Sequence, residues 1–468
     1  MAPRPTSSSD ALFARNRWAF SVGTLGRDMV YALVSLYLIV FLSEVLNASD
    51  SFVWWAGWLI LGARLFDAVM DIVMGSIVDN TRSRWGHYKP WITVGALASA
   101  VCTLLLFTDL GLPDTSYVIA FALIYLLWGL TWTMNDIPYW ALLPALTLDQ
   151  KQRERIGALA KIFATIGLFS VVVAILPVTS ALGDDTRAWF LFTAAVVAIM
   201  LAGQLVTLFG VREPRLAVEQ PKVTLRGLWR VVTGNDQLLW TAIAMVLFMT
   251  GYVTTTSFGV YFFKYAYRDA AMYTPFGAVL GVAQLTGFLV FPLFRRRFSR
   301  RTLYTGATTT MVAGYLLFFF SPMDMVWIGA AGLLLFVGQS FVVVLMLVFL
   351  TDCIEYGHWK LGNRNAAVTF ALQPFINKVG AALGTQIVSV VVVLSGINSA
   401  ATRDDVTPGG LLMMRMAMLV LPPILIVAGY LIYRAKYRID EEMYARIVDE
   451  LAERGQLTKG QGSSNDDR

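Results

Sequence analysis

Two carboxylates and one guanidinium lie at helical spacing inside a long apolar stretch of this chain. Asp67 and Asp71 are four residues apart and Arg64 precedes Asp67 by three, so in a helix all three share one face. A carboxylate in lipid costs about 2.5–3.5 kcal/mol on insertion scales, and such groups usually face a cavity or a partner. One interpretation is a buried salt bridge between Arg64 and one aspartate. Because two carboxylates outnumber one guanidinium, the spacing favours a cation-binding site.

A second set of polar side chains suits the hydroxyls of a sugar. Asp136 and Trp140 are four residues apart in another apolar stretch, and Arg27 and Asp28 lie inside the first one. A carboxylate accepts hydrogen bonds from two hydroxyls, while an indole ring stacks on the apolar face of a sugar ring. The alternative for Trp140 is a place in the aromatic belt at the membrane interface.

Two lysines also lie within apolar stretches. Lys161 is near the start of one and Lys378 is in the middle of another. An ammonium group in lipid requires a partner of opposite charge. We therefore expect carboxylates from the first, second or fourth apolar stretch to face them.

Charges at the ends of two apolar stretches suggest a gate. Gly75 permits a close approach of helices, and Asp79 can pair with loop cations such as Arg84. Asp352 and Glu355 end another stretch in a similar way. Ion pairs that break and re-form would suit a conformational switch, whereas ordinary interfacial charge is the simpler alternative.

The sequence gives little support for an enzyme. His87 and His358 are both expected in loops, and no histidine or cysteine spacing suits a metal site or a nucleophile. A phosphate-binding loop of the GxxxxGK[ST] type is absent, which argues against ATP-driven chemistry. Cys102 and Cys353 lie in or beside apolar runs, so no disulfide framework is expected.

The elements that must position these residues are membrane helices. The 468 residues are 57% hydrophobic and 15% charged, against about 25% charged in soluble proteins. Runs of about 20 apolar residues are long enough to cross a bilayer. We expect twelve such helices, at 18–46, 52–79, 90–108, 116–146, 156–180, 188–210, 238–266, 275–294, 302–321, 325–354, 366–396 and 411–434.

The loops predict how the chain is oriented. Most loop Lys and Arg residues follow even-numbered segments, whereas loops after odd-numbered segments hold only Arg187, Arg268 and Arg403. The positive-inside rule then predicts a protein of the cell membrane with both termini on the cytoplasmic side. The basic inner loops also explain the net charge of +6 without a nucleic-acid partner.

The longest inner connection divides the chain into two groups of six helices. This arrangement predicts two pseudo-repeats with a binding site between them, as in the major facilitator fold. The expected parts are a cytoplasmic arm (1–17), a first bundle (18–210), a middle loop with an amphipathic piece (211–237), a second bundle (238–434) and a tail with a short amphipathic helix (435–468).

Several motifs together resemble the glycoside–pentoside–hexuronide:cation symporters, to which the melibiose carrier belongs. They are AspAlaValMetAspIleValMetGly, AsnAspIleProTyrTrp and AspCysIleGluTyrGly, within a similarity that runs from about Trp18 to Arg438. The resemblance implies an all-α carrier of twelve helices that moves a sugar with Na⁺, Li⁺ or H⁺ by alternating access. We also expect no cofactor and a functional monomer. It implies these roles: Asp67, Asp71 and Thr133 for the cation, Asp28 and Asp136 for sugar hydroxyls, Trp140 for stacking, and Arg64, Lys161 and Lys378 as charge partners.

The chain departs from the family at the cation motif. Met70 and Ile72 flank Asp71 where the family often has Asn and Pro, so an amide oxygen is lost. Na⁺ needs several oxygen ligands, whereas one carboxylate can carry a proton, and the departure therefore favours H⁺. Lys161 stands where the family has arginine, and an ammonium cannot form the planar fork of a guanidinium.

The alternatives to a sugar symporter are a carrier of a lipid or drug, and a membrane sensor that binds sugar without moving it.

Overall fold

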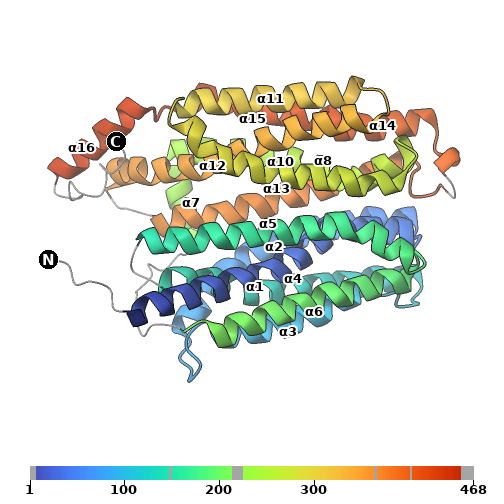
Figure 1. The fold of residues 1–468 in the computed structure, drawn as a ribbon, viewed down its shortest axis with the longest axis horizontal. Helices are drawn as coiled ribbons and strands as arrows, with labels where there is room; N and C mark the ends of the chain where they lie inside the picture. The colour runs from blue at the N-terminus through green and yellow to red at the C-terminus, as the bar shows by residue number, and fades with distance from the viewer. Residues whose placement is uncertain (1–6, 147–149, 213–224, 363–365, 401–402, 455–468) are drawn as a thin grey trace.

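The computed structural model describes residues 7–146, 150–212, 225–362, 366–400 and 403–454, and their regular structure is helical. The helices form two groups that lie side by side, with the start of α1 (Ser7–Val40) and the helix α16 (Glu441–Glu453) at one end (Figure 1). We call this the terminal end, and the opposite one the far end. The fold is the major facilitator fold, as predicted.

The N half contains α1 (Ser7–Val40), α2 (Asp50–Asn80), α3 (Lys89–Leu106), α4 (Asp114–Ala145), α5 (Gln150–Ala181) and α6 (Thr186–Gly210). The C half contains α8 (Asp236–Ser257) continued by α9 (Gly259–Tyr261), α10 (Tyr273–Arg295), α11 (Arg300–Phe320), α12 (Met325–Leu361), α13 (Ala366–Leu394), and α14 (Pro408–Leu419) followed by α15 (Leu421–Lys436).

Polar caps fix where several helices begin. Ser49, Asp185 and Asn235 each accept a backbone amide from the first turn of α2, α6 and α8, at 3.3, 2.8 and 3.0 Å. Such caps satisfy amides that have no partner within the helix. They therefore help to set the first residue of each of these helices.

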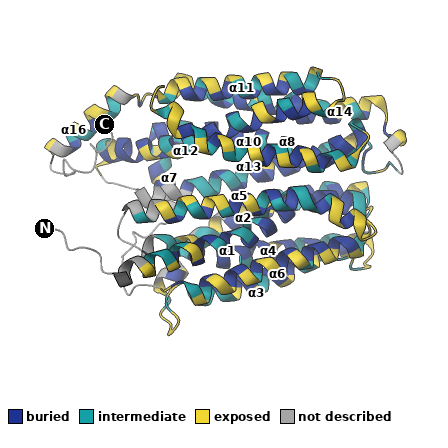
Figure 2. Ribbon diagram, in the orientation of Figure 1, coloured by how far each residue is buried: buried dark blue, intermediate teal, exposed yellow. Residues whose placement is uncertain are grey.

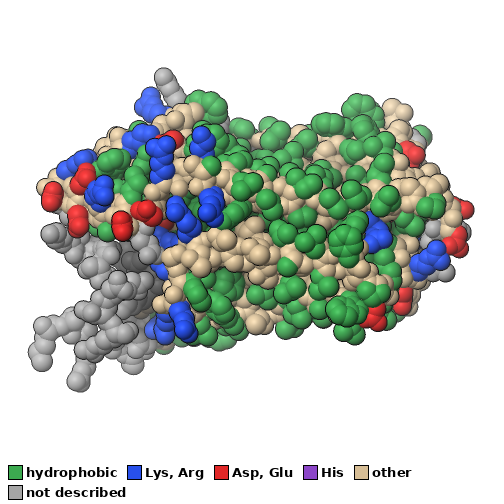
Figure 3. Space-filling view, turned by 90° about the horizontal axis from the view of Figure 1, so that it is seen from above, with side chains coloured by type: hydrophobic (Ala, Val, Ile, Leu, Met, Phe, Trp, Pro, Cys, Tyr) green, Lys and Arg blue, Asp and Glu red, His purple; other side chains and the backbone are tan. Residues whose placement is uncertain are grey.

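Eleven helices in the described part of the chain are long and apolar enough to span a membrane. α2 is the twelfth in the six-plus-six arrangement, and it carries Arg64, Asp67 and Asp71 in its interior. Many exposed residues lie on the outer faces of the bundles (Figure 2). On the face in Figure 3 they are largely hydrophobic, and most visible Lys and Arg lie toward the terminal end.

Several helix boundaries differ from the sequence-based prediction. α12 runs on to Leu361, so His358 is buried within a helix and the prediction of a loop histidine is wrong. The last membrane segment breaks at Val420, because Pro422 and Pro423 follow and proline cannot supply the amides that continue a helix.

Two short helices lie at the terminal end. α7 (Leu225–Gly234) belongs to the middle connection, and α16 (Glu441–Glu453) follows the last membrane helix. α16 buries Ile447 and Leu451, and its Glu450 accepts a 2.7 Å hydrogen bond from the indole of Trp359 on α12. The tail helix is thereby held against the end of α12.

The two halves meet along α2 with α13 and along α5 with α10. Gly57 on α2 allows a close approach to α13, since a Cβ there would lie 2.5 Å from the Ser389 hydroxyl. The Ser389 hydroxyl also donates a 2.6 Å hydrogen bond to the Val53 carbonyl. These contacts bring residues from distant parts of the sequence to one interface.

Candidate functional site

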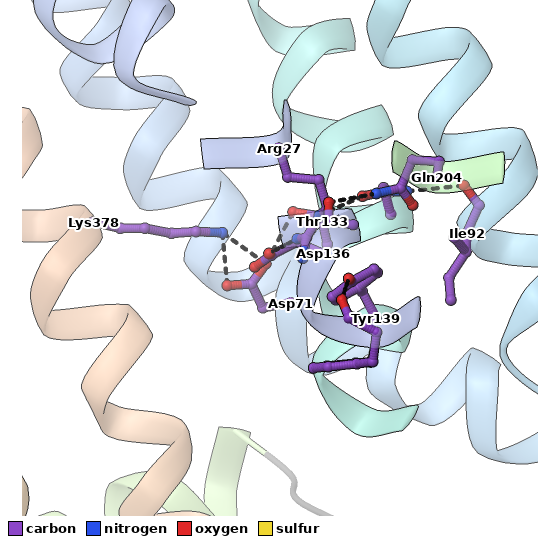
Figure 4. Close-up of polar contacts among 11 residues, drawn as sticks. Arg27, Asp71, Ile92, Thr133, Asp136, Tyr139, Gln204 and Lys378 are labelled. Atoms are coloured by element: carbon purple, nitrogen blue, oxygen red, sulfur yellow. Dashed lines mark hydrogen bonds and ion pairs between the residues drawn. The ribbon is translucent and has the colours of Figure 1, made fainter. Parts of the chain in front are cut away.

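Asp71 lies at the boundary between the halves. Lys378, on α13 of the C half, donates to both carboxylate oxygens of Asp71 at 2.7 Å, and Thr133 on α4 donates to one of them at 2.9 Å (Figure 4). The expected carboxylate partner of Lys378 is therefore Asp71. Since Lys378 is 6% exposed, this is a nearly buried ion pair that crosses from one half to the other.

Asp67 lies one helical turn from Asp71 and is 2% exposed. Its Oδ1 is buried and has no hydrogen-bond partner among the described residues. Gly129 on α4 makes room for the carboxylate, because a Cβ at that position would lie 2.2 Å from Asp67 Oδ1. An unpartnered buried carboxylate oxygen is costly unless another group or a cation binds it.

Arg64 does not form the salt bridge that one interpretation of the sequence required. Its guanidinium donates to the Ser35 hydroxyl at 3.1 Å and lies 5.4 Å from the ring centres of Tyr31 and Trp128. Among the described side chains it has no carboxylate within 4.0 Å, although Asp67 is near enough to interact electrostatically. Arg64 therefore forms no ion pair with either Asp67 or Asp71.

A second charged cluster joins α1 to α4. Arg27 is 2% exposed, forms an ion pair with Asp136, and donates to the Asn135 side chain at 2.9 Å. The guanidinium also lies 4.0 Å from the centre of the Tyr139 ring. Asp136 therefore has a partner already, and a sugar hydroxyl would share this carboxylate with Arg27.

Asn135, Tyr139 and Gln204 support this cluster and were not predicted as site residues. Asn135 donates to the Ile92 carbonyl at 2.9 Å and to Gln204 at 3.3 Å, which fixes it beside Arg27 (Figure 4). The signal was present in the AsnAspIleProTyrTrp motif, where Asn135 and Tyr139 are four residues apart and share a helix face.

Asp28, Lys161 and Trp140 lie around the same region. Asp28 has no hydrogen-bond partner among the described residues, and Lys161, Arg27 and Asp136 are all near enough to interact with it electrostatically. Trp140 is 37% exposed, and its ring lies edge-on to Phe20 at 6.0 Å. The structure thus leaves Asp28 and Trp140 available for a ligand.

The residues expected to form a gate are only partly brought together. No neighbouring helix lies close to Gly75, because a Cβ at this position would meet nothing within 4 Å. The expected close helix approach at Gly75 is therefore wrong for this conformation. Arg84 is exposed in the loop after α2, and the side chain of Asp79 lies outside the described residues. Asp352 pairs with Arg300 and accepts a 3.1 Å hydrogen bond from Tyr437.

Both partners of Asp352 belong to the C half, so this ion pair does not bridge the halves. Glu355 is buried, and its carboxylate lies 4.0 Å from His358 Nδ1 on the same helix. The pairs at the end of α12 therefore hold one half together.

An apolar pocket lies between the halves, farther from the terminal end than the charged clusters. Its lining includes Leu36 and Phe169 from the N half, and Tyr252, Tyr273 and Phe336 from the C half. A sugar needs free hydrogen-bonding groups, but hydroxyls in this lining are already engaged, that of Tyr273 with Tyr37 and that of Thr255 with Tyr315. The charged clusters, and not this pocket, carry the chemistry expected of a sugar and cation site.

Comparison with known proteins decides the family. Residues 19–441 match the family described as MFS/sugar transport protein. The chain belongs to this family. It is 30% identical to the lactose permease of Lactobacillus delbrueckii subsp. bulgaricus, over 93% of this chain and 72% of that protein. It is 28% identical to the raffinose carrier protein of Pediococcus pentosaceus, over 93% of this chain and 71% of that protein.

A solved structure of a mutant nucleoside transporter NupG has the same fold, with a TM-score of 0.65 at 14% identity, covering 90% of this chain and all of that one. The family match, the related permeases and the twelve-helix fold together identify this family member as a sugar symporter.

Proposed function

We propose that this symporter carries a galactose-containing oligosaccharide and couples its movement to protons. Lactose and raffinose, named for two relatives, both contain galactose. Asp28, Asp136 and Trp140 would bind the sugar, with Lys161 and Arg27 holding the two carboxylates in place. Hydrogen bonds to a charged carboxylate contribute about 1.5–3 kcal/mol each, so two such groups are sufficient for selective binding.

The observation that carries the coupling proposal is the ion pair between Asp71 and Lys378. The ammonium of Lys378, from the opposite half, neutralises Asp71, and the Thr133 hydroxyl donates a further hydrogen bond to the same carboxylate. A coupling cation must therefore displace Lys378 from Asp71 or bind at Asp67, whose Oδ1 has no partner among the described side chains.

The neutral oxygen ligands around this ion pair are few. Thr133 supplies one hydroxyl, while Met70 and Ile72 supply no side-chain oxygen. A proton requires a single carboxylate, whereas Na⁺ or Li⁺ would need a larger oxygen cage. This shortage of oxygen ligands supports H⁺ as the coupling ion.

The protein would lie in the cell membrane as a monomer, with both termini in the cytoplasm. The Lys and Arg side chains near the terminal end support this orientation, because basic loops remain on the cytoplasmic side. The terminal end then faces the cytoplasm and the far end faces outward.

Uptake by purified protein in lipid vesicles tests the proposal. Lactose or raffinose should accumulate with an imposed proton gradient at low Na⁺, and Asp71→Asn should abolish accumulation. Asp236→Asn is the matched control, because Asp236 pairs with Lys360 at the terminal end, away from this site. Accumulation that requires Na⁺ at every pH would overturn proton coupling, and accumulation of neither sugar would overturn the proposed substrate.

A further inference from the structure

The same unusual turn occurs at the far end of both halves. α1 continues into a π-helical turn at Phe41–Val45, and α9 continues into another at Phe262–Ala266. Each turn closes with an amide that bonds five residues back, from Leu46 to Phe41 at 2.8 Å and from Tyr267 to Phe262 at 2.9 Å. π-turns are rare and occur frequently at functional sites.

The chain leaves the two turns in the same way. Ala48 donates to the Leu42 carbonyl and Asp269 to the Phe263 carbonyl, six residues back and both at 3.0 Å. The residue before each donor, Asn47 or Arg268, has a left-handed backbone, with φ of 50° or 67°. The two halves thus repeat an energetically unfavourable local structure at corresponding positions.

These two turns contact each other across the boundary between the halves. The Glu44 carboxylate, which is 7% exposed, accepts hydrogen bonds from the ammonium of Lys264 and from the Tyr265 hydroxyl at 2.8 Å. Beside it, the Ser43 and Tyr261 hydroxyls lie 2.6 Å apart. Four of these five residues belong to the π-turn segments, and one of the four, Lys264, brings the charge opposite to that of Glu44.

The extra residue in each turn explains why these side chains face one another. One residue added to a helical turn rotates the following side chains by about 100° around the axis. In the N half the rotated residues include Glu44, and in the C half they include Tyr265. Without the π-turns, Glu44 and Tyr265 would point in other directions and the contact between them would be lost.

We propose that the paired π-turns form a latch that holds the far side of the transporter closed, with Glu44 as its central residue. Opening the far side requires Glu44 to separate from Lys264 and Tyr265. The inference rests on the proposed alternating-access cycle, but the latch itself lies outside the sugar and cation clusters. Its strength sets how often the far side opens, and not which sugar or ion is bound.

Pulsed electron spin resonance on the full chain in lipid vesicles tests the latch. Spin labels would be attached to cysteines introduced as Leu182→Cys and Met323→Cys, exposed positions at the far end of the N and C halves. The native Cys102 and Cys353 are both buried. Glu44→Gln removes the charge but keeps the shape, and should raise the ratio of long to short label distances by about tenfold.

Two further variants make the result specific. Tyr265→Phe removes one hydroxyl and should shift the ratio in the same direction by a smaller factor, and it serves if Glu44→Gln does not fold. Asp236→Asn breaks an ion pair within the C half and should leave the distances unchanged. Distances in Glu44→Gln and Tyr265→Phe that match those of the unmodified pair would overturn the proposal.

The distances are recorded without sugar and without an ion gradient. Loss of the proposed sugar or proton specificity would leave them unaffected, so failure of the latch and failure of the proposed function give different results.

Discussion

At the residue scale, the ion pair between Asp71 and Lys378 determines what a coupling cation must do. Both side chains are largely buried, and Thr133 adds a hydrogen bond to the carboxylate. Removing one member of a buried ion pair typically costs about 3–5 kcal/mol, because the remaining charge has no counter-charge. A proton delivered to Asp71 would neutralise the carboxylate and leave the Lys378 ammonium without a counter-charge. The ion pair would then break, and it would no longer hold the C half to the N half.

This reasoning predicts different results for single and double variants. Lys378→Met should lower the unfolding temperature by several degrees and abolish uphill sugar accumulation, because Asp71 is left buried and charged. The double variant Asp71→Asn with Lys378→Met should recover most of the lost stability but no accumulation, since neither charge remains. Thermal unfolding and vesicle uptake measure the two properties separately. A double variant as unstable as the sum of both single variants would contradict this prediction.

A second prediction separates the two proposed sugar carboxylates. Asp28 has no hydrogen-bond partner among the described residues, so Asp28→Asn should leave the unfolding temperature nearly unchanged while weakening sugar binding by about ten- to hundredfold. Asp136 pairs with the buried Arg27, so Asp136→Asn should lower both sugar affinity and stability. Calorimetric titration with lactose, together with thermal unfolding, makes the comparison. Asp28→Asn binding within threefold of the unmodified protein would show that Asp28 is not a sugar ligand.

At the element scale, much of the helix pattern could be predicted, because apolar length is a local property of the sequence. The break at Val420 and the extension of α12 to Leu361 were missed. The first depends on a Pro pair inside an otherwise apolar run. The second depends on packing of polar residues such as Glu355 and His358 against neighbouring helices, which hydropathy does not register.

The tail helix α16 provides a prediction at this scale. Ile447 is 2% exposed where α16 packs against the end of α12, so Ile447→Asp should detach the helix and speed proteolysis of the tail. Burying an unpaired carboxylate is costly, whereas sugar binding lies elsewhere and should be unchanged. Ala445→Asp is the control, because Ala445 is exposed on the same helix. Limited proteolysis measures the rate, and equal rates in the two variants would show that α16 is not held by this contact.

The residue with a left-handed backbone after the first π-turn, Asn47, provides another prediction at this scale. Asn47 has φ of 50°, a conformation that costs most residues about 1–2 kcal/mol but is readily adopted by Asn and Gly. Asn47→Ala should therefore lower the unfolding temperature and weaken closure of the far end, whereas Asn47→Gly should behave nearly like the unmodified protein. Thermal unfolding and far-end label distances test this. Asn47→Ala and Asn47→Gly with the same stability would show that the backbone is not strained there.

At the scale of the whole molecule, the charges inside the apolar helices could be located from the sequence, whereas their individual partners could not. Asp67 and Asp71 stand out because they lie in an apolar helix, and that signal is local. The partner of Asp71 is 307 residues away in the chain, and the partner of Arg27 is on α4. Such pairs depend on how helices pack within a bundle and between the two bundles, which one sequence does not encode in any local pattern.

The docking of the halves can be tested at Gly57. This glycine lets α2 approach α13, and a Cβ there would lie 2.5 Å from the Ser389 hydroxyl and 2.6 Å from its Cβ. Gly57→Val should push Ser389 away and break its hydrogen bond to the Val53 carbonyl. Overpacking of this kind costs about 1–3 kcal/mol, which is enough to change a population ratio by roughly tenfold or more. Because that cost arises only when the far ends touch, the variant should favour the far-side-open state.

Gly62→Val is the matched control, since it adds the same side chain to the same helix at a position with nothing within 4 Å of a Cβ. Label distances between the far ends should lengthen in Gly57→Val and stay unchanged in Gly62→Val. The ion pair between Asp71 and Lys378 lies on the same two helices, so separation of α2 from α13 should also weaken it and reduce coupled uptake. If Gly57→Val leaves both the distances and the uptake at the Gly62→Val level, the close packing of α2 on α13 does not hold the far side closed.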